Sequence, residues 1–241
     1  MFGLAERVAD AVLYEGNVVD PYAASASKNR LRWQFGIVAP QAPRDHGEPS
    51  LAQTECLIGA DSRHSTVSSR RLWVRVRCLR PRPGTTDAAR PWLQGVPTAI
   101  DALVAMPLDR LPLERDVALT EADVDLHLVV RASAVERFVK VQLRLENREP
   151  WRPEFSSDRS AMFDRSVVAA HLLIAVAGGA FVSLIEPPAD AAAAADACRN
   201  RHTWPVLVGD PSERTLMLSS PILLYDYPSA DSLAVATTQS A

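Results

Sequence analysis

The segment LWVRVRCL, residues 72–79, carries the clearest strand pattern in the chain. Apolar side chains occupy every second position, and arginine or tryptophan fills most of the positions between them. Successive side chains of a strand point to opposite faces of its sheet. The alternation therefore predicts a half-buried antiparallel strand with an apolar inner face and a basic outer face.

Similar patterns on both sides of this segment extend the predicted sheet. Residues 124–130 and 139–145 alternate with the same period, and residues 132–136 connect them, which predicts a hairpin. Lys140, Gln142 and Arg144 then mark its solvated face. Shorter apolar segments predict further strands at residues 31–38, 51–58, 181–185, 204–208 and 215–224.

Helices are predicted at three places. Apolar residues recur every four positions in residues 4–12, which is typical of a short amphipathic helix. Residues 161–177 follow a possible N-cap at Asp158 or Ser160 and are apolar on almost every side in their second half, so we expect a buried central helix. Residues 190–200 predict a short alanine-rich helix. The expected fold class is α+β, a mainly antiparallel sheet with one buried central helix.

The proline-rich segment at residues 81–97 is the strongest candidate for a linker between domains. The strand pattern resumes after it with the same period, so it does not divide the chain into two units. We therefore expect a single α+β domain over residues 1–228. Residues 229–241 have little core-forming pattern and predict a flexible C-terminal tail.

Composition and charge argue against several classes of partner. The formal net charge is -3, so no strong positive field draws the chain to nucleic acid or to anionic lipid. The longest apolar run, residues 167–184, is interrupted by His171 and by glycines, which argues against a membrane span. The three scattered cysteines and an N-terminus without signal-peptide character predict a cytoplasmic protein.

The sequence lacks the standard catalytic and phosphate-binding motifs. Weak metal-ligand candidates are Cys56, Cys198 and His202, of which the last two are four residues apart. Three ligands from distant segments make an incomplete set, and a buried thiol with a surface imidazole explains the same residues. We therefore expect no metal and no cofactor.

The densest group of bonding and stacking side chains lies in LYEGNVVDPYAASASKNRLRWQFGIVAP, residues 13–40. Its basic and aromatic members predict a surface that binds a protein or an anion, because guanidinium groups pair with carboxylates and stack on aromatic rings. These members are Tyr22, Lys28, Arg30, Arg32 and Trp33. Alternatively, Arg30 or Arg32 ties the N-terminal segment to an internal carboxylate. Possible pocket carboxylates are Glu15, Glu55 and Asp226.

Several blocks of the chain together resemble a family of uncharacterised, mainly actinobacterial proteins encoded near nickel–iron hydrogenase genes. The blocks are residues 13–36, QTECL at 53–57, GGAFVSLIEPP at 178–188, CRNRHTWPVL at 198–207 and SSPILLYDYP at 219–228. The resemblance implies a non-catalytic accessory or assembly factor that contacts hydrogenase subunits or maturation factors. The alternative is an enzyme of unknown class, with a charged pocket built from Glu15, Arg30, Arg32, Glu55 and Asp226.

Overall fold

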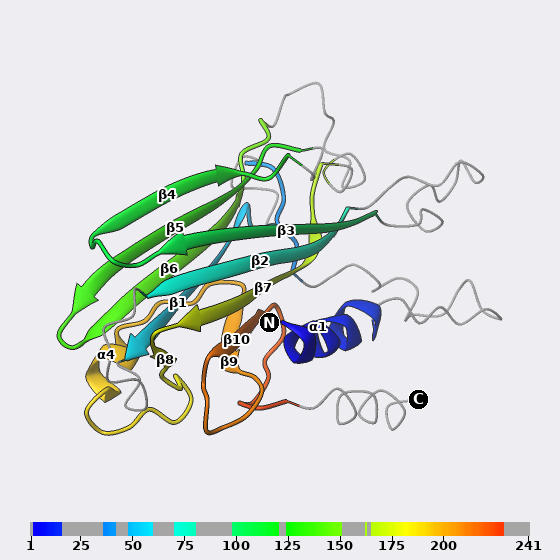
Figure 1. The fold of residues 1–241 in the computed structure, drawn as a ribbon. Coiled ribbons are helices and arrows are strands. Elements are labelled where there is room, and N and C mark those ends of the chain that lie inside the picture. The colour runs from blue at the N-terminus through cyan, green and yellow to red at the C-terminus, as the bar shows by residue number, and fades with distance from the viewer. Residues whose placement is uncertain are drawn as a thin grey trace, which may run out of the picture.

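The computed structural model describes residues 2–15, 36–41, 48–59, 70–80, 98–120, 124–150, 162 and 165–228, without the side chains of residues 11–15 and 98–99. The fold is built from two five-stranded antiparallel sheets, shown in Figure 1. The first sheet has the order β4 (Leu113–Ala118), β5 (Leu126–Val135), β6 (Phe138–Asn147), β1 (Leu51–Gly59) and β8 (Ala180–Phe181). The second has the order β3 (Thr98–Pro107), β2 (Arg71–Arg80), β7 (Val168–Ala177), β10 (Leu216–Ser220) and β9 (Trp204–Leu207).

The main core lies between the two sheets and joins residues of both. In the second sheet, Val74 of β2 lies between Val104 of β3 and Ile174 of β7. In the first sheet, Leu128 of β5 lies opposite Leu145 of β6. All but the partly buried Val104 are fully buried, so the alternation seen in the sequence directs one row of each strand into a shared interior.

Two helices cover the outer faces of the sandwich, as Figure 1 shows. Helix α1 (Gly3–Glu15) packs Ala5 and Val8 against a second apolar cluster that includes Leu173 of β7 and Leu218 of β10. Ion pairs from Arg75 to Glu6 and from Arg77 to Asp10 fix the helix above β2. Helix α4 (Ala192–Asp196) packs its alanines against Leu57 and Phe138 on the first sheet.

The predicted buried helix at residues 161–177 is wrong, and so is the α+β fold class. Residues Val168–Ala177 form β7, a central strand hydrogen-bonded to β2 and β10. One face of β7 lines the main core with Leu172, and the other packs under α1 with Leu173. A strand covered on both faces reads as a continuous apolar run, so its sequence shows no alternation that would distinguish it from a buried helix.

The strand predictions around residues 72–79, 51–58 and the hairpin are confirmed by β2, β1 and the β5–β6 pair. The hairpin is tighter than predicted, because β5 runs to Val135 and leaves only Glu136 and Arg137 in the turn. The predicted alanine-rich helix is also shorter, with its ends at Ala192 and Asp196. Three predicted segments lie wholly or mostly outside the described residues. They are the proline-rich segment 81–97, the tail 229–241 and most of the strand at residues 31–38. Neither helix in the described part of the chain is long and apolar enough to cross a membrane.

Candidate functional site

The predicted binding cluster of the N-terminal segment lies outside the described residues, namely Tyr22, Lys28, Arg30, Arg32 and Trp33. Glu15 is described only as the last backbone position of α1. The structure does place the two other predicted carboxylates, Glu55 and Asp226, and the three weak metal candidates. A functional site within the described residues would be built from these side chains and from the hollows beside them.

Glu55 lies in the middle of β1, on the outer face of the first sheet, and its carboxylate is fully engaged. Lys140 Nζ is 2.5 Å from Glu55 Oε2, Gln142 Nε2 donates to Oε1 at 2.7 Å, and the backbone N–H of Arg199 donates to Oε2 at 2.9 Å. Burial alone would raise the pKa of Glu55, but these donors outweigh it and hold the pKa below its ordinary value. The carboxylate therefore stays ionised and joins β1, β6 and the segment after α4.

The segment after α4 is bound to β1 by further hydrogen bonds. The backbones of Gln53 and Arg201 exchange two hydrogen bonds of 2.9 and 2.8 Å. Asn200 Oδ1 accepts from the Glu55 N–H at 2.8 Å and from Thr54 Oγ1 at 3.0 Å. The QTECL and CRNRH blocks of the sequence thus form one hydrogen-bonded junction, with Glu55 at its centre.

The weak metal candidates do not assemble a site in the described part of the chain, where no group of three or more His, Cys, Asp or Glu side chains is placed to hold a metal ion. Cys56 is buried in the main core, and burial raises the pKa of its thiol. Cys198 is partly buried, and its Sγ contacts the carbonyl of Ala194 at 3.5 Å. His202 is exposed. These contacts fit the structural interpretation of the two thiols.

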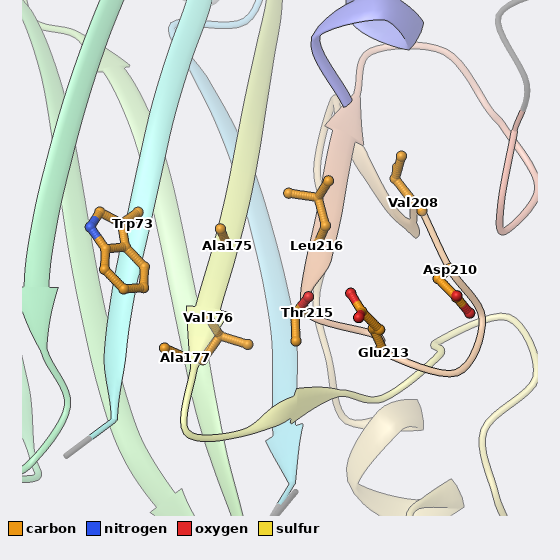
Figure 2. Close-up of a pocket in the computed structure, with 10 residues that line it drawn as sticks. Trp73, Ala175, Val176, Ala177, Val208, Asp210, Glu213, Thr215 and Leu216 are labelled. Carbon is orange, nitrogen blue, oxygen red and sulfur yellow. The ribbon is translucent and has the colours of Figure 1, made fainter. Parts of the chain in front are cut away.

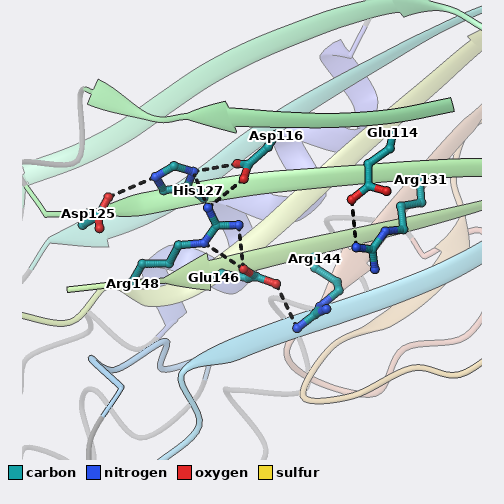
Figure 3. Close-up of polar contacts among 8 residues, drawn as sticks. All are labelled: Glu114, Asp116, Asp125, His127, Arg131, Arg144, Glu146 and Arg148. Carbon is teal, nitrogen blue, oxygen red and sulfur yellow. Dashed lines mark hydrogen bonds and ion pairs between the residues drawn. The ribbon is translucent and has the colours of Figure 1, made fainter. Parts of the chain in front are cut away.

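A network of ion pairs covers the outer face of β4, β5 and β6, as Figure 3 shows. The two ring nitrogens of His127 lie 2.6 Å from Asp116 and 3.0 Å from Asp125. Arg148 joins Asp116 to Glu146, which also pairs with Arg144. The hydrogen bond with His127 lowers the pKa of Asp116, and Arg148 lowers it further. The charges in this network are already paired with one another, so we interpret it as a solvated sheet surface.

The sequence analysis missed this network, although it placed Gln142 and Arg144 on the solvated face. The sequence feature that could reveal the network is the pairing of acidic residues on one strand with basic residues on the next. Glu114 of β4 lies opposite Arg131 of β5, and their side chains approach to 2.8 Å. Cross-strand pairs of opposite charge can only be recognised once the register is known. Residues 113–118 were not predicted as a strand, so that register was not available.

A hollow of about 550 Å³ lies beside Glu55 on the same face. Its walls include Pro112, Glu114, Arg131 and Lys140. The charges that line it are paired across the hollow's own walls, Glu55 with Lys140 and Glu114 with Arg131. It therefore offers a ligand little unpaired charge among the side chains that line it.

A second, smaller hollow of about 210 Å³ lies between the second sheet and the loop before β10. Figure 2 shows Trp73 of β2, Ala175 of β7 and Leu216 of β10 along its apolar side, with Asp210 and Glu213 on the loop. Ligand pockets usually have volumes of about 300–1,000 Å³. This hollow is therefore below the size typical of a small-molecule site.

A third hollow of about 560 Å³ surrounds Asp226, and we call it the Asp226 groove. It is lined by Ser183, Ile185, Glu186, Pro188, Leu207, Pro211, Ser212, Arg214, Tyr225, Asp226 and Tyr227. Asp226 accepts hydrogen bonds from Ser183 Oγ at 2.5 Å and from the Leu207 N–H at 2.7 Å. The Tyr227 N–H donates to the Leu207 carbonyl at 2.7 Å. These bonds bring together the three later blocks of the sequence, residues 178–188, 198–207 and 219–228.

Exposed apolar side chains distinguish the Asp226 groove from the other hollows. Tyr225 is 84% exposed and Ile185 is 45% exposed, and both line the groove. Leu223, at 76% exposed, lies two residues before Tyr225. The Ser183 hydroxyl accepts from the backbone N–H groups of Ile185 and Glu186, which fixes the turn that carries Ile185. The groove therefore combines apolar contact area with a hydrogen-bonded frame.

Glu55 and Asp226 line different hollows, and those hollows share no lining residue. Neither a protein-family model nor a curated protein matches the chain. The fold and the described sites therefore define an antiparallel β-sandwich with a groove that the exposed Ile185 and Tyr225 line.

Proposed function

We propose that the protein is a non-catalytic accessory or assembly factor associated with a nickel–iron hydrogenase, and that it binds a hydrogenase subunit or maturation factor at the Asp226 groove. The association rests on the sequence resemblance over roughly residues 11–228. The observation that supports binding at the groove is the exposure of Tyr225 and Ile185 on a wall that Asp226 holds in place.

Aromatic side chains such as Tyr225 supply large contact areas and are enriched among the residues that carry binding energy. A wall fixed by hydrogen bonds loses less entropy when a partner binds than a wall that must first become ordered. Glu186 and Arg214 lie at the same groove and provide charges of both signs beside the apolar side chains. Such a surface suits a partner that presents apolar side chains among polar ones.

The hydrogen bonds that Glu55 and Asp226 accept within the protein favour a binding function over acid–base catalysis. A general acid or base needs an oxygen within hydrogen-bonding reach of a substrate proton. Both oxygens of Asp226 accept hydrogen bonds from the protein, and Glu55 is bonded to Lys140, Gln142 and Arg199. A cytoplasmic location belongs to the same proposal, and the three free cysteines support it.

Co-purification from the native host tests this proposal. Tagged wild-type protein is expected to capture a hydrogenase subunit or maturation protein that mass spectrometry identifies. The double variant Ile185→Ala with Tyr225→Ala is expected to lower capture by about tenfold or more, because hot-spot truncations cost over about 1 kcal/mol each. The double variant Glu114→Ala with Arg131→Ala truncates two exposed side chains on β4 and β5 and serves as the matched control outside the groove.

Two results would count against the proposal. The first is a wild-type protein that captures no protein of the hydrogenase system. The second is equal capture by the wild type and the groove variant, which would move the contact to another surface.

A further inference from the structure

Among the residues that the structure describes, the edge strand β3 has less protection than the other three sheet edges. Edge strands are normally kept from pairing with other chains by charge, by proline or by short length. β4 carries Glu114, Arg115 and Asp116; β9 has four residues, including Pro205; and β8 has two residues. β3 has ten residues, TAIDALVAMP, with its one proline at the last position and Asp101 as its single ionisable side chain.

Asp101 forms ion pairs within its own sheet. Arg75 Nε on β2 lies 2.6 Å from Asp101 Oδ1, and Arg77 Nε lies 3.8 Å from Oδ2. Asp101 is thus drawn toward β2 and does not present an unpaired charge to an approaching strand. At the centre of the same strand, Leu103 is 58% exposed on the outer face.

We propose that β3 pairs antiparallel with β3 of a second copy of this chain, about a two-fold axis at Leu103. The second sheet would then continue through both molecules. Leu103 would lie opposite Leu103 of the second copy, and the unpaired backbone groups of both edges would satisfy each other.

The sequence of β3 selects this register. The axis at Leu103 sets Asp101 opposite Ala105, Ala102 opposite Val104, and Ile100 opposite Met106 of the second copy. Residues of the inner row therefore meet only residues of the inner row, so the apolar core face continues across the junction.

Other registers are less favourable. An axis at Asp101 sets two carboxylates opposite each other, and like charges opposed across strands are destabilising. An axis at Ala102 sets Asp101 opposite Leu103 and leaves that leucine without an apolar partner. In the Leu103 register no like charges oppose, because Asp101 faces an alanine.

A second copy also fits this edge better than an arbitrary strand. A strand that adds to β3 must offer small or apolar side chains on both faces and no unpaired charge at its centre. β3 itself meets these requirements. Because the contact is then isologous, it closes as a dimer and leaves no further exposed copy of the edge.

Light scattering of the full chain after size-exclusion chromatography, over a concentration series, tests the proposal. The wild type is expected to have twice the monomer mass. Leu103→Lys is expected to raise the dimer dissociation constant by roughly 100-fold or more, because two leucines lose their burial and two ammonium groups oppose each other. Leu223→Lys is the matched control, since it makes the same change at a similarly exposed leucine away from β3.

The register has its own test at position 105. Ala105→Lys places a cation opposite Asp101 of the second copy and is expected to tighten the dimer at low salt. Ala105→Glu places an anion there and is expected to weaken it.

A short thiol-reactive cross-linker is expected to join two copies of Leu103→Cys. It is not expected to join two copies of Ala105→Cys, which would lie about 14 Å apart along the strands; the wild type controls for its own cysteines.

A wild type that stays monomeric over the whole series overturns the proposal, whether or not β3 then binds a strand of another protein. A dimer that is equally stable with Leu103→Lys overturns it as well. Stronger cross-linking through position 105 than through position 103, or an equal effect of Ala105→Lys and Ala105→Glu, overturns the register. Circular dichroism of each variant shows whether it is folded, and the two position-105 charges provide the test if Leu103→Lys is not.

Discussion

At the scale of single residues, buried and partly buried polar groups connect segments that are far apart in the sequence. Glu55 joins β1 to Lys140 and to the backbone after α4, and Asp226 joins Ser183 to Leu207. The sequence identified both carboxylates as notable but could not supply their partners. Those partners are brought in by strand pairing and by the course of the loops, which no local pattern encodes. The hollows that the two residues line were likewise beyond prediction.

Replacing Glu55 by Gln tests its connecting role. The change removes the ion pair with Lys140 and leaves a buried amide facing donors, so we expect the free energy of unfolding to fall by about 1–3 kcal/mol. Urea denaturation measures this difference. Glu114→Gln breaks the exposed pair with Arg131 and is expected to change stability little, because solvent screens that pair. Equal effects of the two substitutions would contradict the role of Glu55.

His171 gives the molecule a predictable acid sensitivity. Its pKa is lowered from 6.5 to about 4, mainly by burial; the carbonyl of Ala169, 2.7 Å from Nδ1, opposes the shift, and nearby Arg77 adds to it. The unfolded chain then binds the proton more readily than the folded protein. Stability is therefore fully present above pH 6.5 and is lost as the pH falls from 6.5 to about 4.

The expected loss over this range is roughly 3 kcal/mol in the free energy of unfolding. Urea denaturation at a series of pH values measures it for the wild type and for His171→Leu. The variant is expected to be less stable at neutral pH, where it lacks the hydrogen bond to Ala169, but to have a flatter pH profile. An unchanged slope in the variant would show that other groups cause the acid sensitivity.

At the scale of elements, the sequence predicted strands best where one face is exposed. β2 and the β5–β6 hairpin were found because polar side chains interrupt their apolar rows. β7 was mistaken for a helix because α1 covers the face that would otherwise be polar. β3 was missed because its exposed positions are mostly small or apolar. The missing alternation in β7 therefore reflects the helix that covers it, and the missing alternation in β3 reflects the apolar side chains that it exposes at the sheet edge.

Leu173 tests the packing between β7 and α1. It is fully buried in the cluster beneath the helix, so Leu173→Ala is expected to lower the free energy of unfolding by about 2–4 kcal/mol. Hydrogen exchange of residues 3–10 is expected to speed up in the variant, because α1 loses part of its packing surface. Leu223→Ala, at a leucine that is 76% exposed, provides the comparison. Unchanged exchange in α1 would contradict the packing.

At the scale of the whole molecule, the sandwich presents three kinds of surface with different expected uses. The outer face of β4, β5 and β6 carries charges that pair with one another. The Asp226 groove carries exposed apolar side chains on a fixed frame. Among the described sheet edges, β3 carries a long and mostly apolar strand. A dimer formed through β3 and a partner bound at the groove use different residues. A test that contradicts one proposal therefore leaves the other unaffected.

Hydrogen exchange of the complex with the proposed hydrogenase partner tests the binding proposal most directly, because it locates the contact on the chain. We expect backbone amides of residues 183–188 and 223–227 to exchange more slowly when the partner is bound, while those of residues 126–147 are unchanged. Slower exchange on the charged face of β5 and β6, with no change at the Asp226 groove, would contradict the account.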